Sequence, residues 1–131
     1  MIQVNELESL AKARLNDAVK LHESQRFDGA AYICGYAIEL KLKSRICKTL
    51  KWHGYPETPK EFENYKSFKT HKFDTLLSLT RIENTIKTNY IHEWSIVKEW
   101  NPELRYKPVG FMHRIEMQRF IDSTNTLLRV L

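Results

Sequence analysis

The segment formed by residues 29–50 constrains the fold more than any other, because its centre is apolar on nearly every side. Residues 30–40 read AAYICGYAIEL, and helix-forming residues continue to position 50. A helix on the surface of a small domain needs only one apolar stripe, so a helix that is apolar all round should be enclosed by neighbours. Gly35 costs about 1 kcal/mol relative to alanine inside a helix, and we therefore expect another element to pack closely against it.

Four other segments, residues 4–24, 72–81, 83–100 and 111–129, carry apolar residues at spacings of three and four. This spacing is the helical period. Asn5 and Asp28 are the expected N-caps of the first two helices. No segment has a convincing strand pattern, and 131 residues fit one domain. The sequence therefore predicts an all-α fold with five helices around one core.

Residues 52–70 interrupt this pattern and form the longest predicted connection. The segment contains Gly54, Pro56 and Pro59, which are residues typical of turns, and one short helical turn is expected after Pro59. A connection of this length in a compact domain often has a function or moves.

Composition and charge exclude several classes of protein. The net charge of +5 permits RNA, a nucleotide or an acidic protein as partner, without choosing between them. No apolar run approaches the ~20 residues that span a bilayer, and the first residues do not resemble a signal peptide. Cys34 and Cys47 are thirteen positions apart on one predicted helix and belong to no metal-ligand cluster. We therefore expect a cytoplasmic protein without metal, cofactor or membrane segment.

Four short motifs occur in an order that resembles one known family. They are Leu10-Ala11 with Ala18, the run GYAIELKLK at 35–43, HKFDTLL at 71–77 and WNPELRY at 100–106. Together they resemble the HEPN family, the higher eukaryotes and prokaryotes nucleotide-binding domains. The resemblance spans nearly the whole chain.

The resemblance to the HEPN family implies one domain over residues 1–131, folded as an antiparallel four- to five-helix bundle that usually dimerises. Many HEPN proteins are metal-independent ribonucleases, often toxins paired with a small nucleotidyltransferase. Three functions therefore stay open. The first is a module that binds RNA, a nucleotide or a nucleotidyltransferase-type partner. The second is a ribonuclease toxin of a toxin–antitoxin pair, and the third is a structural dimerisation domain.

The ribonuclease motif of that family is an arginine, roughly four to six residues and then a histidine, which supply a cation for the phosphate and a general acid or base. The nearest candidates here are Arg105 and His113, with seven residues between them. Pro108 and Gly110 lie in that interval, so the pair cannot share one regular helix face. We therefore expect little or no cleavage of RNA. The alternative is a structural Arg105 and an exposed His113.

Glu39 is the acidic residue in the most apolar part of the chain. Burial of an unpaired carboxylate is unfavourable, so Glu39 should have a partner or reach a wet cleft. Arg105 is the expected partner, because the two residues lie in the two strongest family motifs. A ligand-binding or catalytic role for Glu39 is the alternative.

Two groups of residues are candidates for binding the phosphates of RNA or a nucleotide. Lys41, Arg45 and Lys48 share one face of the central helix, and His71 with Lys72 begins the next predicted helix. The alternative for the first group is a solvated face whose cations suit a helix C-terminus, and for the second a capping or packing role.

The aromatic content predicts a homodimer. Three tryptophans, six tyrosines and six phenylalanines, together with the apolar central helix, exceed what a small bundle needs for its own core. A two-fold copy is the commonest way to cover such surface. The expected interface includes Tyr90, Trp94 and Phe111, with residues 52–70 near its rim.

Overall fold

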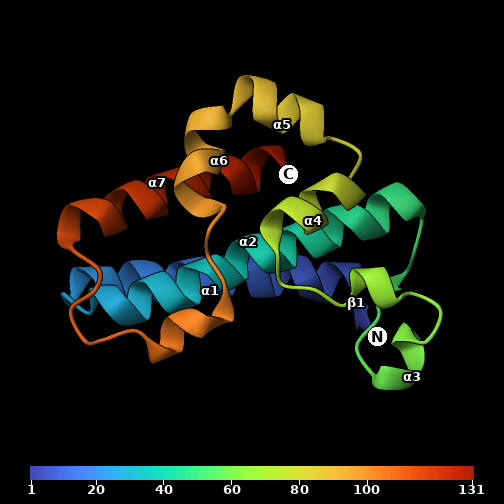
Figure 1. The fold of residues 1–131 in the computed structure, drawn as a ribbon, viewed down its shortest axis with the longest axis horizontal. Helices are drawn as coiled ribbons and strands as arrows, with labels where there is room; N and C mark the ends of the chain where they lie inside the picture. Colours follow the sequence, from blue (N-terminus) through green and yellow to red (C-terminus); the bar gives the residue numbers. More distant parts are fainter.

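The computed structural model describes all residues from 1 to 131 and shows an all-α fold (Figure 1). Its two longest helices, α1 (Val4–Glu23) and α2 (Phe27–Leu50), are joined by the short turn 24–26 and run antiparallel. The last helix, α7 (Arg114–Val130), packs against both of them. The predicted all-α class is therefore confirmed, although the chain forms seven α-helices rather than the four or five expected.

Helix α2 lies at the centre of the molecule, as its apolar sequence predicts. It contacts α1, α7 and α4, and eleven of its residues are buried. At Gly35 the indole ring of Trp100 approaches so closely that an added Cβ would lie 2.0 Å from it. The indole Nε1 of Trp100 donates a hydrogen bond to the carbonyl oxygen of Ala31, at 3.0 Å. The close packing expected at Gly35 is thus confirmed.

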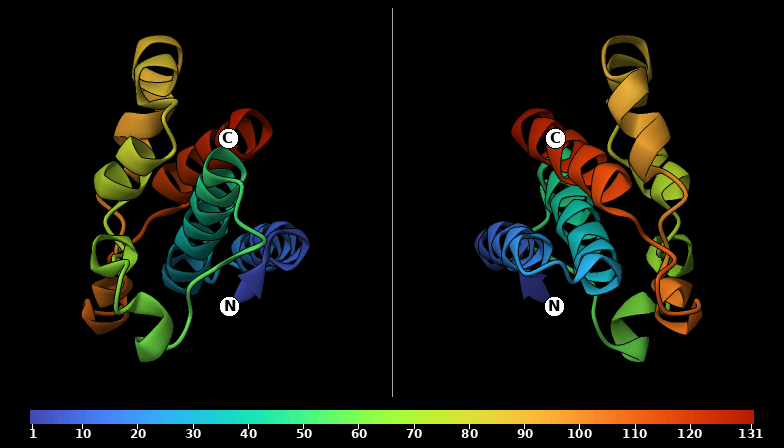
Figure 2. Two further views of the ribbon diagram at one scale, coloured as in Figure 1. Left: turned by 90° about the vertical axis from the view of Figure 1, so that its right-hand side faces the viewer. Right: turned by 90° about the vertical axis from the view of Figure 1, so that its left-hand side faces the viewer.

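Three short helices, α4 (Phe73–Leu79), α5 (Glu83–Asn89) and α6 (Ile91–Val97), form a layer on the side of α2 and α7 that faces away from α1 (Figure 2). The single helix expected over 83–100 is interrupted at Tyr90, where φ is −132° and ψ is 31°. The apolar spacing continues across this break, so the pattern alone does not reveal it. Trp94 is 1% exposed, because it belongs to the core of its own chain. Its expected place in a dimer interface is therefore wrong.

The connection between α2 and α4 is more structured than expected. β2 (Gly54–Tyr55) pairs in antiparallel register with β1 (Ile2–Gln3) at the start of the chain. The short helix α3 (Pro59–Phe62) begins after Thr58, whose side chain accepts a hydrogen bond from the backbone N–H of Glu61. The 3₁₀ helix η1 (Lys66–Phe68) follows. The strands were not expected, because two residues are too short to produce an alternating pattern.

Both expected N-caps are wrong. Gln3 precedes α1 and forms a reciprocal capping arrangement with Glu6, whereas Asn5 lies inside the helix. Asp28 lies in the first turn of α2 and accepts hydrogen bonds from the backbone N–H groups of Gly110 and Met112, at 2.6 and 2.9 Å. It thereby ties the loop before α7 to the start of α2.

The segment between α6 and α7 contains the 3₁₀ helix η2 (Pro102–Tyr106). Asn101 caps it, because its side-chain oxygen accepts a hydrogen bond from the backbone N–H of Glu103 at 2.8 Å. No helix in the structure has the length and apolar character needed to cross a membrane.

Candidate functional site

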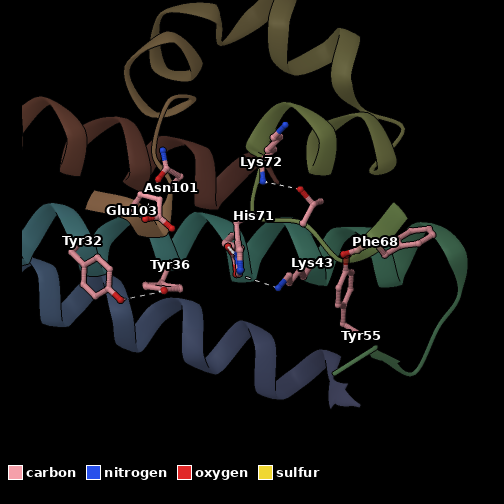
Figure 3. Close-up of polar contacts among 11 residues, drawn as sticks. Tyr32, Tyr36, Lys43, Tyr55, Phe68, His71, Lys72, Asn101 and Glu103 are labelled. Carbon is pink, nitrogen blue, oxygen red and sulfur yellow. Dashed lines mark hydrogen bonds and ion pairs between the residues drawn. The ribbon is translucent and has the colours of Figure 1, made fainter. Parts of the chain in front are cut away.

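Glu39 is a charged residue in the interior of the protein, where it is only 4% exposed. One oxygen of its carboxylate lies 2.6 Å from Nδ1 of His71, and the other lies 3.1 Å from Nζ of Lys43, one helical turn further along α2 (Figure 3). The prediction that Glu39 is buried and paired is confirmed. The predicted partner is wrong: Glu39 forms no ion pair with Arg105, because Lys43 and His71 occupy its carboxylate.

His71 is held in one orientation by this contact. It belongs to the segment just before α4, where the hydroxyl of Thr70 accepts a hydrogen bond from the backbone N–H of Lys72 at 3.1 Å. Because a carboxylate only accepts, Nδ1 of His71 carries the proton in this contact. In the neutral ring, Nε2 then carries the lone pair and has no partner within the protein. The side chain is 57% exposed, so Nε2 is available to a ligand.

His71 lines a cleft of about 730 Å³, which we call the His71 cleft. Residues 70–75 form one of its walls and residues 98–105 form the other, and Tyr36 of α2 contributes from below. The basic side chains that line it, besides His71, are those of Lys72, Lys98 and Arg105. It therefore combines residues that are far apart in the sequence.

Arg105 lies in η2 at the edge of the His71 cleft and forms no ion pair. Its guanidinium group lies 4.8 Å from the centre of the Tyr106 ring. Tyr32 and Tyr36 of α2 have their hydroxyl oxygens 3.4 Å apart. The hydroxyl of Tyr36 and the nearby guanidinium of Arg105 lower the pKa of Tyr32, whereas burial raises the pKa of Tyr36 to about 12.

The acidic residues of the His71 cleft are Asp74, Glu99 and Glu103. Asp74 is occupied within the protein, because its carboxylate accepts a hydrogen bond from Nε1 of Trp94 at 2.9 Å and lies 3.5 Å from Nζ of Lys87. No group of three histidine, cysteine, aspartate or glutamate side chains has the geometry of a metal site. The polar character of the cleft therefore comes from a fixed histidine and several cations, opposed by two free carboxylates.

In the basic stripe predicted on α2, formed by Lys41, Arg45 and Lys48, two of the three residues contact α1 instead of facing a ligand site. Lys41 and Lys48 both pair with the carboxylate of Glu8 on α1, and the hydroxyl of Ser44 donates to the same oxygen at 3.0 Å. These contacts, with Lys48 first, lower the pKa of Glu8 to about 2. Arg45 is half-buried and forms no ion pair. We leave Lys41, Arg45 and Lys48 out of the candidate site, because two of the three cations join α1 to α2.

The structure separates the two residues of the candidate catalytic pair. Arg105 lines the His71 cleft, whereas His113 is exposed just before α7 and is not part of the lining. The cleft instead brings Arg105 together with His71 and Lys72, which the sequence suggested for a different reason. The structure thus favours the alternative of an exposed His113 and gives Arg105 a different histidine as neighbour.

Tyr36, Lys43 and Lys98 also belong to this region, although none of them was expected there from the sequence. The position of Lys43 was available, because a lysine four residues after a glutamate on a helix is an ordinary ion-pair spacing. Lys98 carries no signal in the sequence, since its place in the cleft depends on how the segment after α6 turns.

Comparison of the chain with protein-family models, curated proteins and solved structures finds no match. The HEPN resemblance carried by the four sequence motifs therefore stays a prediction.

Proposed function

We propose that this protein binds a phosphate-bearing ligand, an RNA strand or a nucleotide, in the His71 cleft. The observation that carries the proposal is that an arginine without an acidic partner and a histidine fixed by a buried carboxylate line the same cleft. The HEPN resemblance implies the same class of ligand.

The chemistry of the cleft suits an anion with several oxygen atoms. A guanidinium group donates in a planar fork that matches two oxygens of a phosphate, and Arg105 has no carboxylate in its way. Lys72 and Lys98 add exposed positive charge on the two opposing walls. The hydroxyls of Tyr32 and Tyr36 lie near Arg105 and supply further donors. Because most of the residues that line the open cleft are polar or charged, and its free cations outnumber its free carboxylates, it favours an anionic ligand over an apolar one.

Fluorescence anisotropy with a labelled single-stranded RNA and with a labelled adenine nucleotide tests this proposal. The variant Arg105→Ala should bind at least about tenfold more weakly, a loss of about 1.4 kcal/mol. Arg129→Ala is the matched control, because it removes the same charge from an exposed site at the end of α7. The proposal is wrong if the wild type binds neither ligand, or if both variants lose affinity equally.

A second candidate function, a metal-independent ribonuclease, is favoured by the contact between Glu39 and His71. A buried carboxylate that fixes Nδ1 leaves Nε2 of His71 placed to take the proton of an RNA 2′-hydroxyl, and Arg105 is placed to stabilise the charged phosphate. This candidate needs His71 in the role that the sequence suggested for His113.

One assay separates the two candidates. Labelled RNA is incubated with the protein in the presence of a chelator, and cleavage is compared with binding. We expect weak or no cleavage, because the family's Arg and His spacing is missing. Robust cleavage that is lost in His71→Ala, while RNA binding remains, would establish the ribonuclease instead.

The expected partners are part of the same proposal. A second copy of the chain and a nucleotidyltransferase-like protein are the partners that the HEPN resemblance implies. Co-purification of the protein with a nucleotidyltransferase encoded next to it would test the second of these.

A further inference from the structure

A second pocket lies beside the segment that leads into the His71 cleft. It measures about 430 Å³ and is formed by the start of the chain together with residues between Lys51 and Tyr65. Its aromatic side chains are those of Trp52 and Tyr65, and Lys51 and His53 add polar groups. We call it the Trp52 pocket.

The two aromatic rings of the Trp52 pocket rest on a fixed support. The ring centre of Trp52 lies 5.0 Å from that of Tyr65 and 5.0 Å from that of Phe68. Trp52 is half-buried, whereas Tyr65 is 43% exposed. An aromatic ring that is exposed but held by other rings is a platform on which a planar group can stack with little loss of side-chain freedom.

The surroundings of the Trp52 pocket carry unpaired positive charge. Residues 51–72 contain five exposed lysines, none of which forms an ion pair, namely Lys51, Lys60, Lys66, Lys69 and Lys72. Two of the three glutamates in this segment, Glu57 and Glu61, are bound by the ammonium group of Met1 at 3.5 and 2.7 Å. The charge that remains free in this segment is therefore mainly positive, as a polyanion requires.

The 3₁₀ helix η1 covers only Lys66–Phe68, and Tyr65 and Lys69 flank it. The ring centres of Tyr65 and Phe68 are 6.1 Å apart, so the two rings pack against each other. Lys66 and Lys69 are both exposed, one on either side of Phe68 in the sequence. Aromatic support and exposed positive charge therefore occur together in this segment.

The Trp52 pocket and the His71 cleft share one framework of contacts. Lys43 pairs with Glu39 and also lies over the ring of Tyr55, 5.1 Å from its centre. The hydroxyl of Tyr55 donates a hydrogen bond to the carbonyl oxygen of Phe68 at 2.6 Å, as Figure 3 shows. Phe68 in turn contacts Trp52. The support of the pocket is thereby connected to the carboxylate that orients His71.

We propose that the Trp52 pocket binds a nucleobase of a single-stranded RNA whose phosphate, further along the strand, occupies the His71 cleft. The inference rests on the proposed function and selects an RNA strand over a mononucleotide as the ligand. Tyr65 lines the pocket and Thr70 lines the cleft, five residues later. That interval spans at most about 17 Å of chain, or about five stacked nucleotides at about 3.4 Å each. Lys66 and Lys69 lie between Tyr65 and Thr70 in the sequence and are exposed, so we expect them to contact the intervening phosphates.

The length of the RNA is the first test. Binding of oligoadenylates with one, two, four, six and ten nucleotides is measured by competition against a labelled hexamer. We expect affinity to rise at least tenfold between the dinucleotide and the hexamer, because only the longer strand reaches both sites. A further rise from six to ten nucleotides should be small. Equal affinity for the dinucleotide and the hexamer would overturn the inference.

Substitutions at the Trp52 pocket are the second test. Tyr65→Ala should weaken hexamer binding about tenfold and leave dinucleotide binding unchanged, because loss of a stacking platform affects only a strand that reaches it. Tyr65→Phe keeps the ring and should bind like the wild type. Circular dichroism verifies that each variant is folded. If Tyr65→Ala binds the hexamer as well as the wild type does, the pocket takes no nucleobase.

The lysines are tested by the salt dependence of hexamer binding. The double variant Lys66→Ala with Lys69→Ala should lower the slope of log K against log salt by about 1.4, because each of the two lost phosphate contacts removes about 0.7. Lys12→Ala with Arg129→Ala removes the same charge from exposed sites elsewhere and should leave the slope unchanged.

The failures of the two proposals are distinguishable. If short and long RNAs bind equally and only Arg105→Ala reduces binding, the His71 cleft is a phosphate site and the Trp52 pocket is not part of it. If no RNA of any length binds, both proposals are wrong.

Discussion

At the scale of single residues, the carboxylate of Glu39 has partners of two kinds. Lys43 is a neighbour on the same helix and is itself mostly buried, whereas His71 comes from a different segment and is more than half exposed. The first contact neutralises a charge in the interior, and the second orients a ring that faces the cleft. The same residue thus links the stability of the fold to the geometry of the site.

Removal of the Glu39 carboxylate should therefore destabilise the protein. Glu39→Ala leaves Lys43 without its partner at a mostly buried position, and we expect the free energy of unfolding to fall by about 3 kcal/mol. Glu39→Gln should have a smaller effect, because the amide keeps the volume and one acceptor oxygen. Urea titration at neutral pH measures both. Glu99→Ala, at an exposed carboxylate without an ion pair, is the control and should change stability by less than about 0.5 kcal/mol.

A second residue, Gly35, tests whether close packing or helix propensity dominates in α2. Gly35→Ala gains about 1 kcal/mol of helix propensity but places a methyl group inside the ring of Trp100, so we expect a net loss of about 2 kcal/mol or more. Gly29→Ala, in the first turn of the same helix, meets only Leu21 at 3.8 Å and should be neutral or stabilising. Thermal unfolding of the two variants is the measurement. Equal stability of the two would mean that Trp100 moves aside freely.

At the scale of secondary-structure elements, the contact between α1 and α2 has an electrostatic part at one end. Glu8 of α1 meets Lys41 and Lys48 of α2, and its pKa is lowered to about 2 from the ordinary value of 4.5. A group with a depressed pKa contributes stability above its ordinary pKa and loses that contribution as the pH falls through the folded pKa. The loss at Glu8 should therefore occur between about pH 5 and pH 2.

The variant Glu8→Gln isolates this contribution. At pH 6 we expect it to be less stable than the wild type by about 1–2 kcal/mol, a value reduced for the partial exposure of the site to solvent. At pH 2 the difference should be much smaller, because the Glu8 carboxyl of the wild type is then about half protonated in the folded state and almost fully protonated in the unfolded chain. Urea titrations at several pH values measure both. Glu63→Gln, at an exposed residue without an ion pair, should show no such convergence.

The elements also show what periodicity in the sequence predicts and what it does not. The central position of α2 was predictable, because its apolar residues surround the helix and its glycine needs a close neighbour. The break at Tyr90 was not, since apolar spacing records which residues are buried but not whether the axis is straight. The two strands were too short to leave a pattern. Their pairing depends on contact between the start of the chain and residues 54–55.

The candidate site was predictable only in parts. Glu39, His71 and Arg105 were each singled out, for the burial of a charge, for a helix start and for a family motif. The contact between Glu39 and His71 depends on tertiary structure, because the two residues are 32 positions apart. Arg105 lines the same cleft without a contact to Glu39. The motifs that contain Glu39 and Arg105 lie near each other in the fold, but these two charged residues do not pair. Lys43, on the same helix as Glu39, was the nearer cation.

At the scale of the whole molecule, the three most exposed large apolar side chains lie in one part of the chain. Tyr106, Val109 and Ile115, between η2 and the first turn of α7, are 73%, 100% and 66% exposed. These residues lie close in sequence to Arg105 at the edge of the His71 cleft. Exposure of these apolar side chains to water is unfavourable in a monomer, and a second copy of the chain would bury them. Of the residues expected in the dimer interface, Trp94 is buried in its own chain, whereas Phe111 lies among these exposed residues. We therefore place the interface around residues 106–115.

We therefore expect a homodimer in solution, with an interface that includes Val109 and Ile115 and buries more than roughly 1,000 Å² in total. Light scattering at micromolar concentration should give twice the chain mass of 15.6 kDa. Val109→Asp combined with Ile115→Glu should give the monomer mass, because two charges on an apolar interface are not solvated once it closes. Ile91→Glu, at a side chain that is 52% exposed on α6, should stay dimeric. A monomeric mass for the wild type would show that the dimer prediction is wrong. RNA binding would still be expected in that case, because the His71 cleft is formed entirely by residues of one chain.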